Sequence, residues 1–205
     1  CMYRFQPQRR HAAELARVGE IGELRAVHTL FAYDQRDPAS IRNSLEMGGG
    51  GLMDIGCYAV SGARFLLGRE PRRGLALVER HPAFKIDTSS SAILDFGGAR
   101  SVFTVATQAF PSQRVEVLGT RGRIVMEVPF NQPADVPPSL AVTTALGTRW
   151  PVLPPADQHG LEFEAFSLAL REGRPVPTPP EDAVANQKVL DALVRSERSG
   201  GWESV

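Results

Sequence analysis

The sequence has little cysteine and no excess of charge of either sign. Its 2 cysteines in 205 residues do not make a disulfide framework. Cys1 and Cys57 also lack the spacing of a CxxC redox pair or a zinc site. The 23 basic side chains are matched by 23 acidic ones, so charge gives no reason to expect a nucleic acid or an anionic membrane as partner. We expect reduced thiols, no bound metal and a neutral small molecule as ligand.

Long apolar runs are also missing. No stretch approaches the roughly 20 apolar residues of a membrane span. Arg, Gln and His occur in the first 20 residues, where a signal peptide has an apolar centre. We therefore predict no membrane partner and take the cytoplasm as the default location. The hydrophobic content of 42% is enough to build a core, so we expect one compact domain over residues 1–205.

Residues 48–58, which read GGGGLMDIGCY, are the most informative part of the chain. Asp54 and Tyr58 are four positions apart behind a run of glycines, so on a helix they share one face. Ser61 and Phe65 continue that face, and Gly68 is expected to end the helix. Apolar residues recur at intervals of three and four on the other side: Leu52, Ile55, Ala59, Ala63, Leu66 and Leu67. We predict a core behind this helix and a cleft or a second domain in front of it.

The remaining pattern predicts an α+β domain with helices on one face of a mostly antiparallel sheet. A helix is expected at 7–18, and an alternating strand at 23–33 that is buried on much of both faces. Further strands are expected at 73–80, 89–96, 100–109, 113–119 and 122–128, and one more pair between 140 and 152. The second face of the sheet is expected to carry apolar residues and to associate: Thr104, Ala106, Val115, Val117, Ile124 and Met126.

Two more helices are expected near the end of the chain. Gly160 and Gly173 bracket the first one. The last helix is expected to start at a capping box, with Thr178 as N-cap, Pro179 at the first helical position and Glu181 reaching back. Its narrow apolar stripe, suited to docking on a core, consists of Ala185, Val189, Ala192 and Leu193.

Residues 48–58 resemble the GGGxLxDxGxY motif in the C-terminal domain of Gfo/Idh/MocA-type oxidoreductases. The resemblance extends along most of the chain through the segments Met2-Tyr-Arg-Phe, Ile21-Gly-Glu and Glu181-Asp-Ala. Many members of that family have His where this chain has Tyr58. A tyrosine there is typical of the branch that contains glucose-fructose oxidoreductase, dihydrodiol dehydrogenase and xylose dehydrogenase.

The resemblance implies hydride transfer between NAD or NADP and a sugar, polyol or diol. Tyr58 would exchange a proton with the substrate oxygen, helped by a family lysine, because a phenol with a pKa near about 10 is a poor acid or base unless a cation lies nearby. Asp54 would accept a hydrogen bond from a substrate hydroxyl and orient Tyr58. The resemblance also implies substrate-binding roles for Arg4, Gly50 and Gly51, and a homodimer or larger oligomer formed through the open sheet face.

The nucleotide-binding half of such enzymes is not found in the sequence. No GxGxxG lies between a strand and a helix, and neither Lys85 nor Lys188 precedes a proline. We therefore interpret the chain as a C-terminal domain, a fragment or a truncated product that is inactive alone and binds the cofactor weakly. The alternative is a non-catalytic binding or scaffold domain that lacks its nucleotide-binding half.

Each site residue also has a simpler interpretation. Tyr58 can be an ordinary half-buried tyrosine whose hydroxyl meets a neighbour. Asp54 can merely cap the start of the helix. Residues 48–51 can form a flexible loop rather than one that permits close approach of a substrate or cofactor. Arg4 can be a surface arginine.

Overall fold

Nine strands form a single open sheet in the computed structural model, which describes residues 1–205. The strands are β1 (Leu24–Asp34), β2 (Arg73–Arg80), β3 (Asp87–Asp95), β4 (Arg100–Ala106), β5 (Gln108–Gly119), β6 (Gly122–Glu127), β7 (Leu140–Thr144), β8 (Gly147–Arg149) and β9 (Glu203–Ser204). Their order across the sheet is β8-β7-β6-β5-β1-β4-β3-β2-β9. The β1–β4 pair is parallel, and every other neighbouring pair is antiparallel. The predicted fold class, α+β with a mostly antiparallel open sheet, is confirmed.

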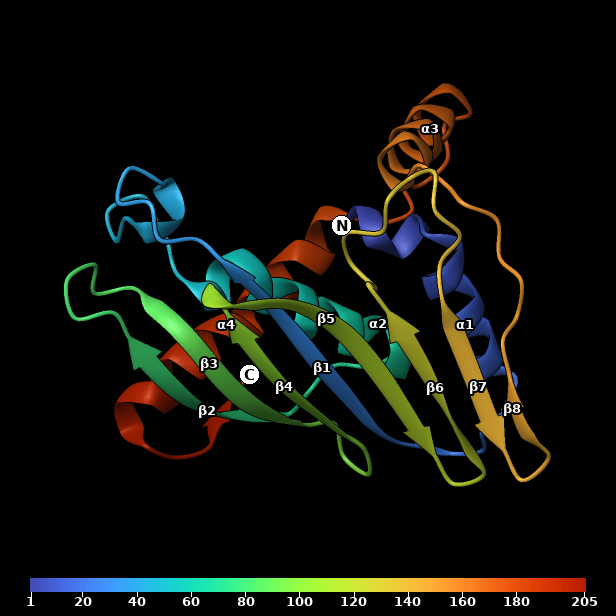
Figure 1. Cartoon of the computed structure of the whole chain (residues 1–205), viewed down its shortest axis with the longest axis horizontal. Helices are drawn as coiled ribbons and strands as arrows, with labels where there is room; N and C mark the ends of the chain where they lie inside the picture. Colours follow the sequence, from blue (N-terminus) through green and yellow to red (C-terminus); the bar gives the residue numbers. More distant parts are fainter.

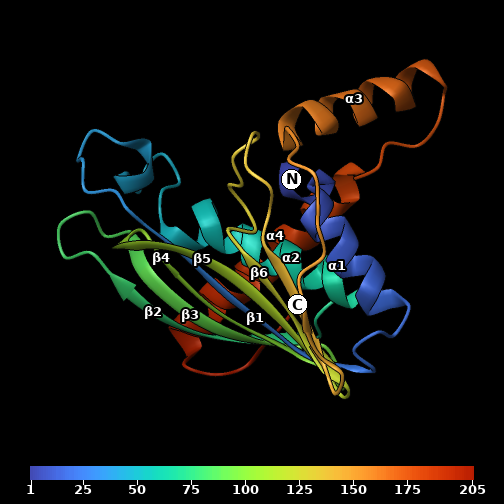
Figure 2. The same cartoon turned by 45° about the vertical axis from the view of Figure 1, so that its right-hand side comes forward.

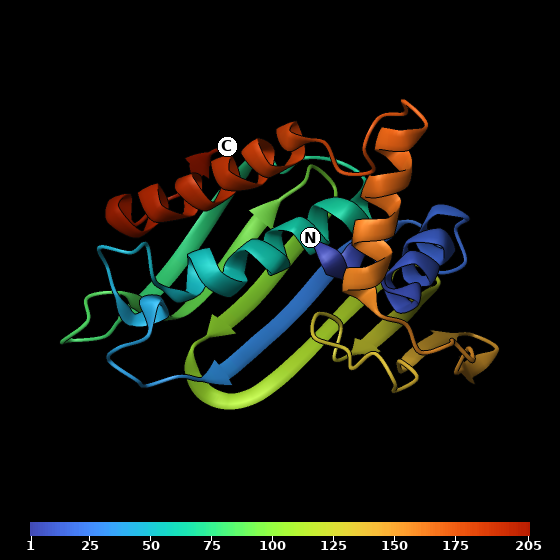
Figure 3. The ribbon, with the colours of Figure 1, turned by 90° about the horizontal axis from the view of Figure 1, so that it is seen from above.

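The helices lie on one side of this sheet, as Figures 1 and 3 show. They are α1 (Pro7–Arg17), α2 (Cys57–Leu67), α3 (Gln158–Arg171) and α4 (Pro180–Ser199). Three short segments add to them: the 3-10 turns η1 (Met2–Phe5) and η2 (Ile41–Asn43), and the π-helical segment η3 (Leu52–Gly56), which runs directly into α2. In Figure 2, α3 stands away from the sheet, above the N-terminal end of the chain. No helix is both long and apolar enough to cross a bilayer.

The central strand β1 shows how the two faces of the sheet differ. Val27, Thr29 and Phe31 are buried on the helix-covered face, whereas His28 and Leu30 are exposed on the other. This strand was predicted to be buried on both faces, and that prediction was wrong, because no element covers the second face. Alternation fixes which residues share a face, but not which face is covered.

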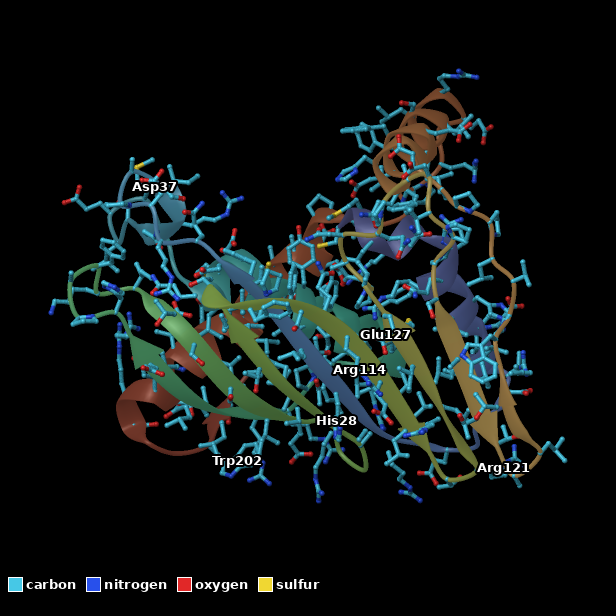
Figure 4. The ribbon with its side chains drawn as sticks, in the orientation of Figure 1. His28, Asp37, Arg114, Arg121, Glu127 and Trp202 are labelled. Atoms are coloured by element: carbon cyan, nitrogen blue, oxygen red, sulfur yellow. The ribbon has the colours of Figure 1, made fainter.

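The composition of the open face also needs correction. Val115, Val117, Ile124 and Met126 were expected there, but all four are buried under the helices. The open face is formed instead by residues that alternate with these, and the pairing register joins them into rows across the strands. They include Leu75, Leu77, Ile93, Val102, Thr104, His28, Leu30, Arg114, Glu116 and Leu118. Figure 4 shows His28 and Arg114 on adjacent strands of the sheet.

Some helix ends lie where the sequence predicts them, and others do not. Gly68 ends α2 in the left-handed conformation, with φ of 63°, as predicted. The predicted capping box at Thr178 is wrong, because Pro179 is the N-cap of α4 and no side chain caps that end. Gly160 lies inside α3, which begins earlier because Asp157 accepts a hydrogen bond from the His159 N–H at 3.0 Å.

Candidate functional site

The glycine run makes room for a buried carboxylate at the start of η3. Asp87 of β3 accepts a hydrogen bond from the Leu52 N–H at 2.6 Å and another from the Ser90 hydroxyl at 3.0 Å. A side chain on Gly50 would collide with the Asp87 carboxylate, and Gly50 has a φ of 124°. The negative charge and the free N–H groups at the start of a helix attract each other. The simple interpretation in which Asp54 caps this helix therefore does not hold, since Asp87 does so.

Asp54 points instead into a network with two residues from other segments. Its carboxylate accepts a hydrogen bond from the Tyr33 hydroxyl at the end of β1 and lies 3.3 Å from the Arg42 Nε. Burial raises the pKa of the Tyr33 phenol above its usual value, and the hydrogen bond to Asp54 raises it further. Tyr33 therefore stays protonated and can donate to Asp54 at any physiological pH.

Tyr58 is packed among aromatic rings while its hydroxyl remains available. The ring centroids of Tyr3, Phe31 and Phe130 lie 5.7, 5.8 and 5.7 Å from that of Tyr58. Within the chain, the Tyr58 hydroxyl meets the Met2 sulfur at 3.9 Å, and a thioether is a weak acceptor. The rings therefore fix the position of the phenol, and its oxygen can still take a stronger partner.

The surroundings of Tyr58 favour its protonated form. Burial raises the pKa of the Tyr58 phenol, and the negative charge of Asp54 raises it further. Neither Lys85 nor Lys188 lines the cavity into which Tyr58 points. At neutral pH the group is thus a proton donor unless a cation from outside this chain lowers its pKa.

Asp54 and Tyr58 line one cavity of about 580 Å³. The ends of β1 and β5, the η3–α2 segment and the loops that follow β1 and β6 enclose it. Its lining residues are Phe31, Ala32, Tyr33, Asp34, Gln35, Arg42, Asp54, Ile55, Tyr58, Pro111, Ser112, Gln113, Val128 and Asn131. The cavity thus combines an apolar and aromatic floor with hydroxyl, amide and carboxylate groups, a combination typical of small-molecule sites.

The three residues predicted to bind substrate lie outside this lining. Arg4 donates to the Ser61 hydroxyl at 2.7 Å and forms an ion pair with Asp182 at 3.1 Å, so it ties η1 to α2 and α4. Ser61 was expected to face the cleft but is buried. Gly50 and Gly51 lie against Asp87 rather than beside the cavity. The close approach that the glycines allow is therefore that of a carboxylate within the chain.

Tyr33, Arg42, Gln113 and Asn131 line the cavity but were not identified from the sequence. Gln113 holds the loop after β6, because its Oε1 accepts hydrogen bonds from the N–H groups of Phe130 and Asn131 at 3.2 and 3.1 Å. No pattern in the sequence singles these residues out, because the pairing of β1 with β5 is what brings Tyr33 and Gln113 to the same end of the sheet. Across the whole chain, no group of three or more His, Cys, Asp or Glu side chains is arranged to hold a metal ion.

The residues of this chain fit a substrate better than they fit a nucleotide cofactor. The Tyr58 hydroxyl and the Asp54 carboxylate face an open cavity. A pyrophosphate is held by a glycine-rich turn at the free N-terminus of a helix. Here the corresponding helix start is already occupied by Asp87. The phosphates of a nucleotide cofactor would therefore need contacts other than this helix start.

Comparison with known proteins identifies the family to which the chain belongs. Residues 9–125 match the model of the GFO/IDH/MocA C-terminal domain. An uncharacterized oxidoreductase of Rhizobium meliloti is 38% identical over 100% of this chain and 63% of its own length. A D-xylose 1-dehydrogenase (NADP+) of Haloferax volcanii is 31% identical over 97% of this chain and 61% of its own length.

Solved structures agree with this placement. A 3-ketoreductase from Actinomadura kijaniata, solved with NADP and TDP-benzene, is 26% identical and matches with a TM-score of 0.87 over 95% of this chain and 60% of its own. The chain thus spans about three fifths of the length of these relatives. The resemblance noted from the GGGxLxDxGxY motif is confirmed, and this chain belongs to the GFO/IDH/MocA C-terminal domain family.

Proposed function

We propose that this chain is the substrate-binding half of an NAD(P)-dependent oxidoreductase that moves a hydride between nicotinamide and a carbon of a sugar, polyol or diol. The observation that carries this proposal is the cavity in which the available Tyr58 hydroxyl and the hydrogen-bonded Asp54 carboxylate face the same space. The names of the relatives, which include NADP-dependent xylose dehydrogenase and a ketoreductase, support the same class of reaction.

In this mechanism the bound nicotinamide supplies or accepts the hydride. Tyr58 acts on the substrate oxygen. In the direction of reduction, the phenol gives its proton to the carbonyl oxygen as the carbon gains a hydride, and an alcohol results. Its raised pKa suits this direction, because the phenol is fully protonated at neutral pH. Oxidation needs the phenolate, and therefore a cation beside Tyr58 that lies outside this chain.

Asp54 has the task of orienting the substrate. One of its partners, Tyr33, donates a hydrogen bond, and Arg42 supplies positive charge, so the carboxylate is fixed in direction. An ionised carboxylate accepts hydrogen bonds from substrate hydroxyls. Asp54 would thus hold a hydroxyl next to the reacting carbon and present that carbon to Tyr58.

We also propose that two copies associate through the open sheet face, as the family resemblance implies. Exposed apolar side chains cluster there, among them Leu77, Ile93 and Val102, which are 78%, 36% and 38% exposed. Contiguous exposed apolar surface is typical of an interface. The cytoplasm remains the location that we predict.

The test is an assay of the full-length oxidoreductase that carries this chain, with a panel of aldoses, polyols and diols and with either nicotinamide cofactor. We expect turnover by the full-length protein and none by the 205-residue chain alone. The competing proposal, a scaffold domain without catalysis, predicts no turnover in either form. Turnover by the 205-residue chain alone would contradict the proposal that this chain is only the substrate-binding half of the enzyme.

A further inference from the structure

We propose that the cavity accepts an uncharged sugar or polyol and excludes one linked to a nucleoside diphosphate. This inference rests on the proposed function, which leaves both possibilities open. Both occur among the relatives: the xylose dehydrogenase is named for a free sugar, whereas a reductase from Actinomadura kijaniata is named for a dTDP-linked one. The distribution of charge around the cavity separates the two.

The arginine that lines the cavity and the arginine next to the lining in sequence are both already paired with a carboxylate. Arg42, which lines the cavity, lies 3.3 Å from Asp54, and Arg36, which follows the lining residue Gln35 in the sequence, lies 2.8 Å from Asp34. The lining itself contains two carboxylates, Asp34 and Asp54, against one cation. A diphosphate would have to break one of these pairs and would then lie next to the carboxylate left behind, where like charges repel.

The other usual phosphate site, the start of a helix, is also occupied. The helix that begins with η3 is the one beside the cavity, and the Asp87 carboxylate accepts the Leu52 N–H there. Asp87 is buried, so it cannot move aside for another anion without losing that bond and the one from Ser90. A phosphate therefore finds a negative charge where the helix dipole would otherwise attract it.

The uncharged lining groups match hydroxyls well. The Gln113 carbonyl oxygen is occupied by two backbone N–H groups, which leaves its NH₂ free to donate. The Gln35 carbonyl oxygen likewise accepts from the Asp37 N–H at 2.9 Å, so its NH₂ is also free. Amide donors combined with the carboxylate acceptors of Asp34 and Asp54 can satisfy both the donor and the acceptor side of sugar hydroxyls.

Calorimetry on the full-length protein tests this proposal, with the cofactor site saturated with NADP+ so that nucleotides compete only for the substrate cavity. The probes are xylose, xylitol and thymidine diphosphate. We expect a saturable signal for xylose or xylitol that does not change with salt, and no competition by thymidine diphosphate. Competition by thymidine diphosphate for the wild-type cavity would overturn the inference, and so would absence of any signal from the uncharged compounds.

A pair of matched variants sharpens the test. Asp34→Ala removes a carboxylate from the lining and frees its partner Arg36, so it should create thymidine diphosphate binding, at least about tenfold tighter than in the wild type. Glu23→Ala frees Arg25 from a similar pair, 2.9 Å long, at the other end of β1 and should create none. Equal effects of the two variants would contradict a local charge effect. Sugar binding without turnover would contradict the proposed reaction and leave this inference intact. Turnover of a dTDP-sugar and of no uncharged sugar would support the proposed reaction and contradict this inference.

Discussion

Asp54 shows how a side chain acquires a function through its partners rather than through its position in the helix. Its place in the first turn of η3 is typical of a capping carboxylate, but Asp87 already fills that role. Tyr33 and Arg42 hold Asp54 toward the cavity instead. A carboxylate held by one hydroxyl and one guanidinium keeps lone pairs free for a ligand.

We expect Asp54→Asn in the full-length enzyme to raise KM for the sugar by about tenfold or more and to lower kcat less. The amide keeps the shape but loses the charge that accepts substrate hydroxyls and pairs with Arg42. Steady-state kinetics measure this. Asp95→Asn is the control, since Asp95 is also paired with an arginine, Arg73 at 3.0 Å, but lies away from the cavity. An equal rise in KM for both variants would contradict the role given to Asp54.

Titration of the buried Cys57 thiol should lower the stability of the fold at alkaline pH. Burial raises the pKa of the Cys57 thiol from 9.0 to about 11, and the charge of Asp54 contributes. Since the folded pKa lies above the unfolded value, this contribution to stability is complete below pH 9 and is lost as the pH rises toward 11. The free energy of unfolding, measured by urea titration, should fall over that range.

Cys57→Ser should make this fall smaller without abolishing it, because the pKa values of the Tyr33 and Tyr58 phenols are raised as well. Cys1→Ser is the control, because Cys1 is exposed. A pH dependence in Cys57→Ser equal to that of the wild type would show that the thiol is not the titrating group.

At the scale of elements, the sequence predicted most helices and strands because each shows its own periodicity. The stripe along α2, the alternation along β1 and the left-handed end at Gly68 depend only on neighbouring residues. The predictions were wrong where contacts between residues distant in the sequence determine the local structure. Asp87 is 35 positions from Leu52, and the buried Ser61 accepts a hydrogen bond from Arg4, which is 57 positions away. No local pattern contains such pairs.

The start of η3 offers a test of this element. We expect Gly50→Ala to destabilise the fold by roughly 2 to 4 kcal/mol, because the added carbon meets Asp87 and the backbone has a φ of 124°. Gly48 also has a positive φ, 74°, but a carbon added there meets nothing within 4 Å. Gly48→Ala should therefore lower the free energy of unfolding by only about 1 kcal/mol. Thermal unfolding compares the two. Similar costs would mean that Asp87 does not require the glycine.

For the whole molecule, the sequence predicted an uncovered sheet face but assigned four residues to it that are buried under the helices, Val115, Val117, Ile124 and Met126. The site was predicted in part: Asp54 and Tyr58 are neighbours on one helix, so spacing alone places them together. Tyr33 and Gln113 come from strand ends that the pairing of β1 with β5 brings to the same cavity, and a hydrogen bond to the Gln113 side chain holds the loop residue Asn131 there. Register of this kind is a property of the assembled sheet.

Because the open sheet face exposes apolar side chains, we predict that the protein self-associates. Sedimentation should show a dimer or larger species at micromolar concentration, and Val102→Glu should weaken it by at least about tenfold, since Val102 lies opposite His28 in the middle of the sheet. Leu146→Glu places the same charge on an exposed leucine in the turn between β7 and β8 and should have no effect. A wild-type monomer would contradict the interface.

Replacement of Tyr58 by Phe in the full-length enzyme tests the central claim most directly. Loss of the proton donor should cut kcat by about 10²-fold or more, while cofactor affinity and thermal stability stay close to wild type, because the ring and its aromatic contacts remain. Tyr3→Phe is the control, since it removes a hydroxyl from the adjacent ring, which does not line the cavity. Near-normal turnover in Tyr58→Phe would contradict the account and leave the cavity a binding site without this catalytic group.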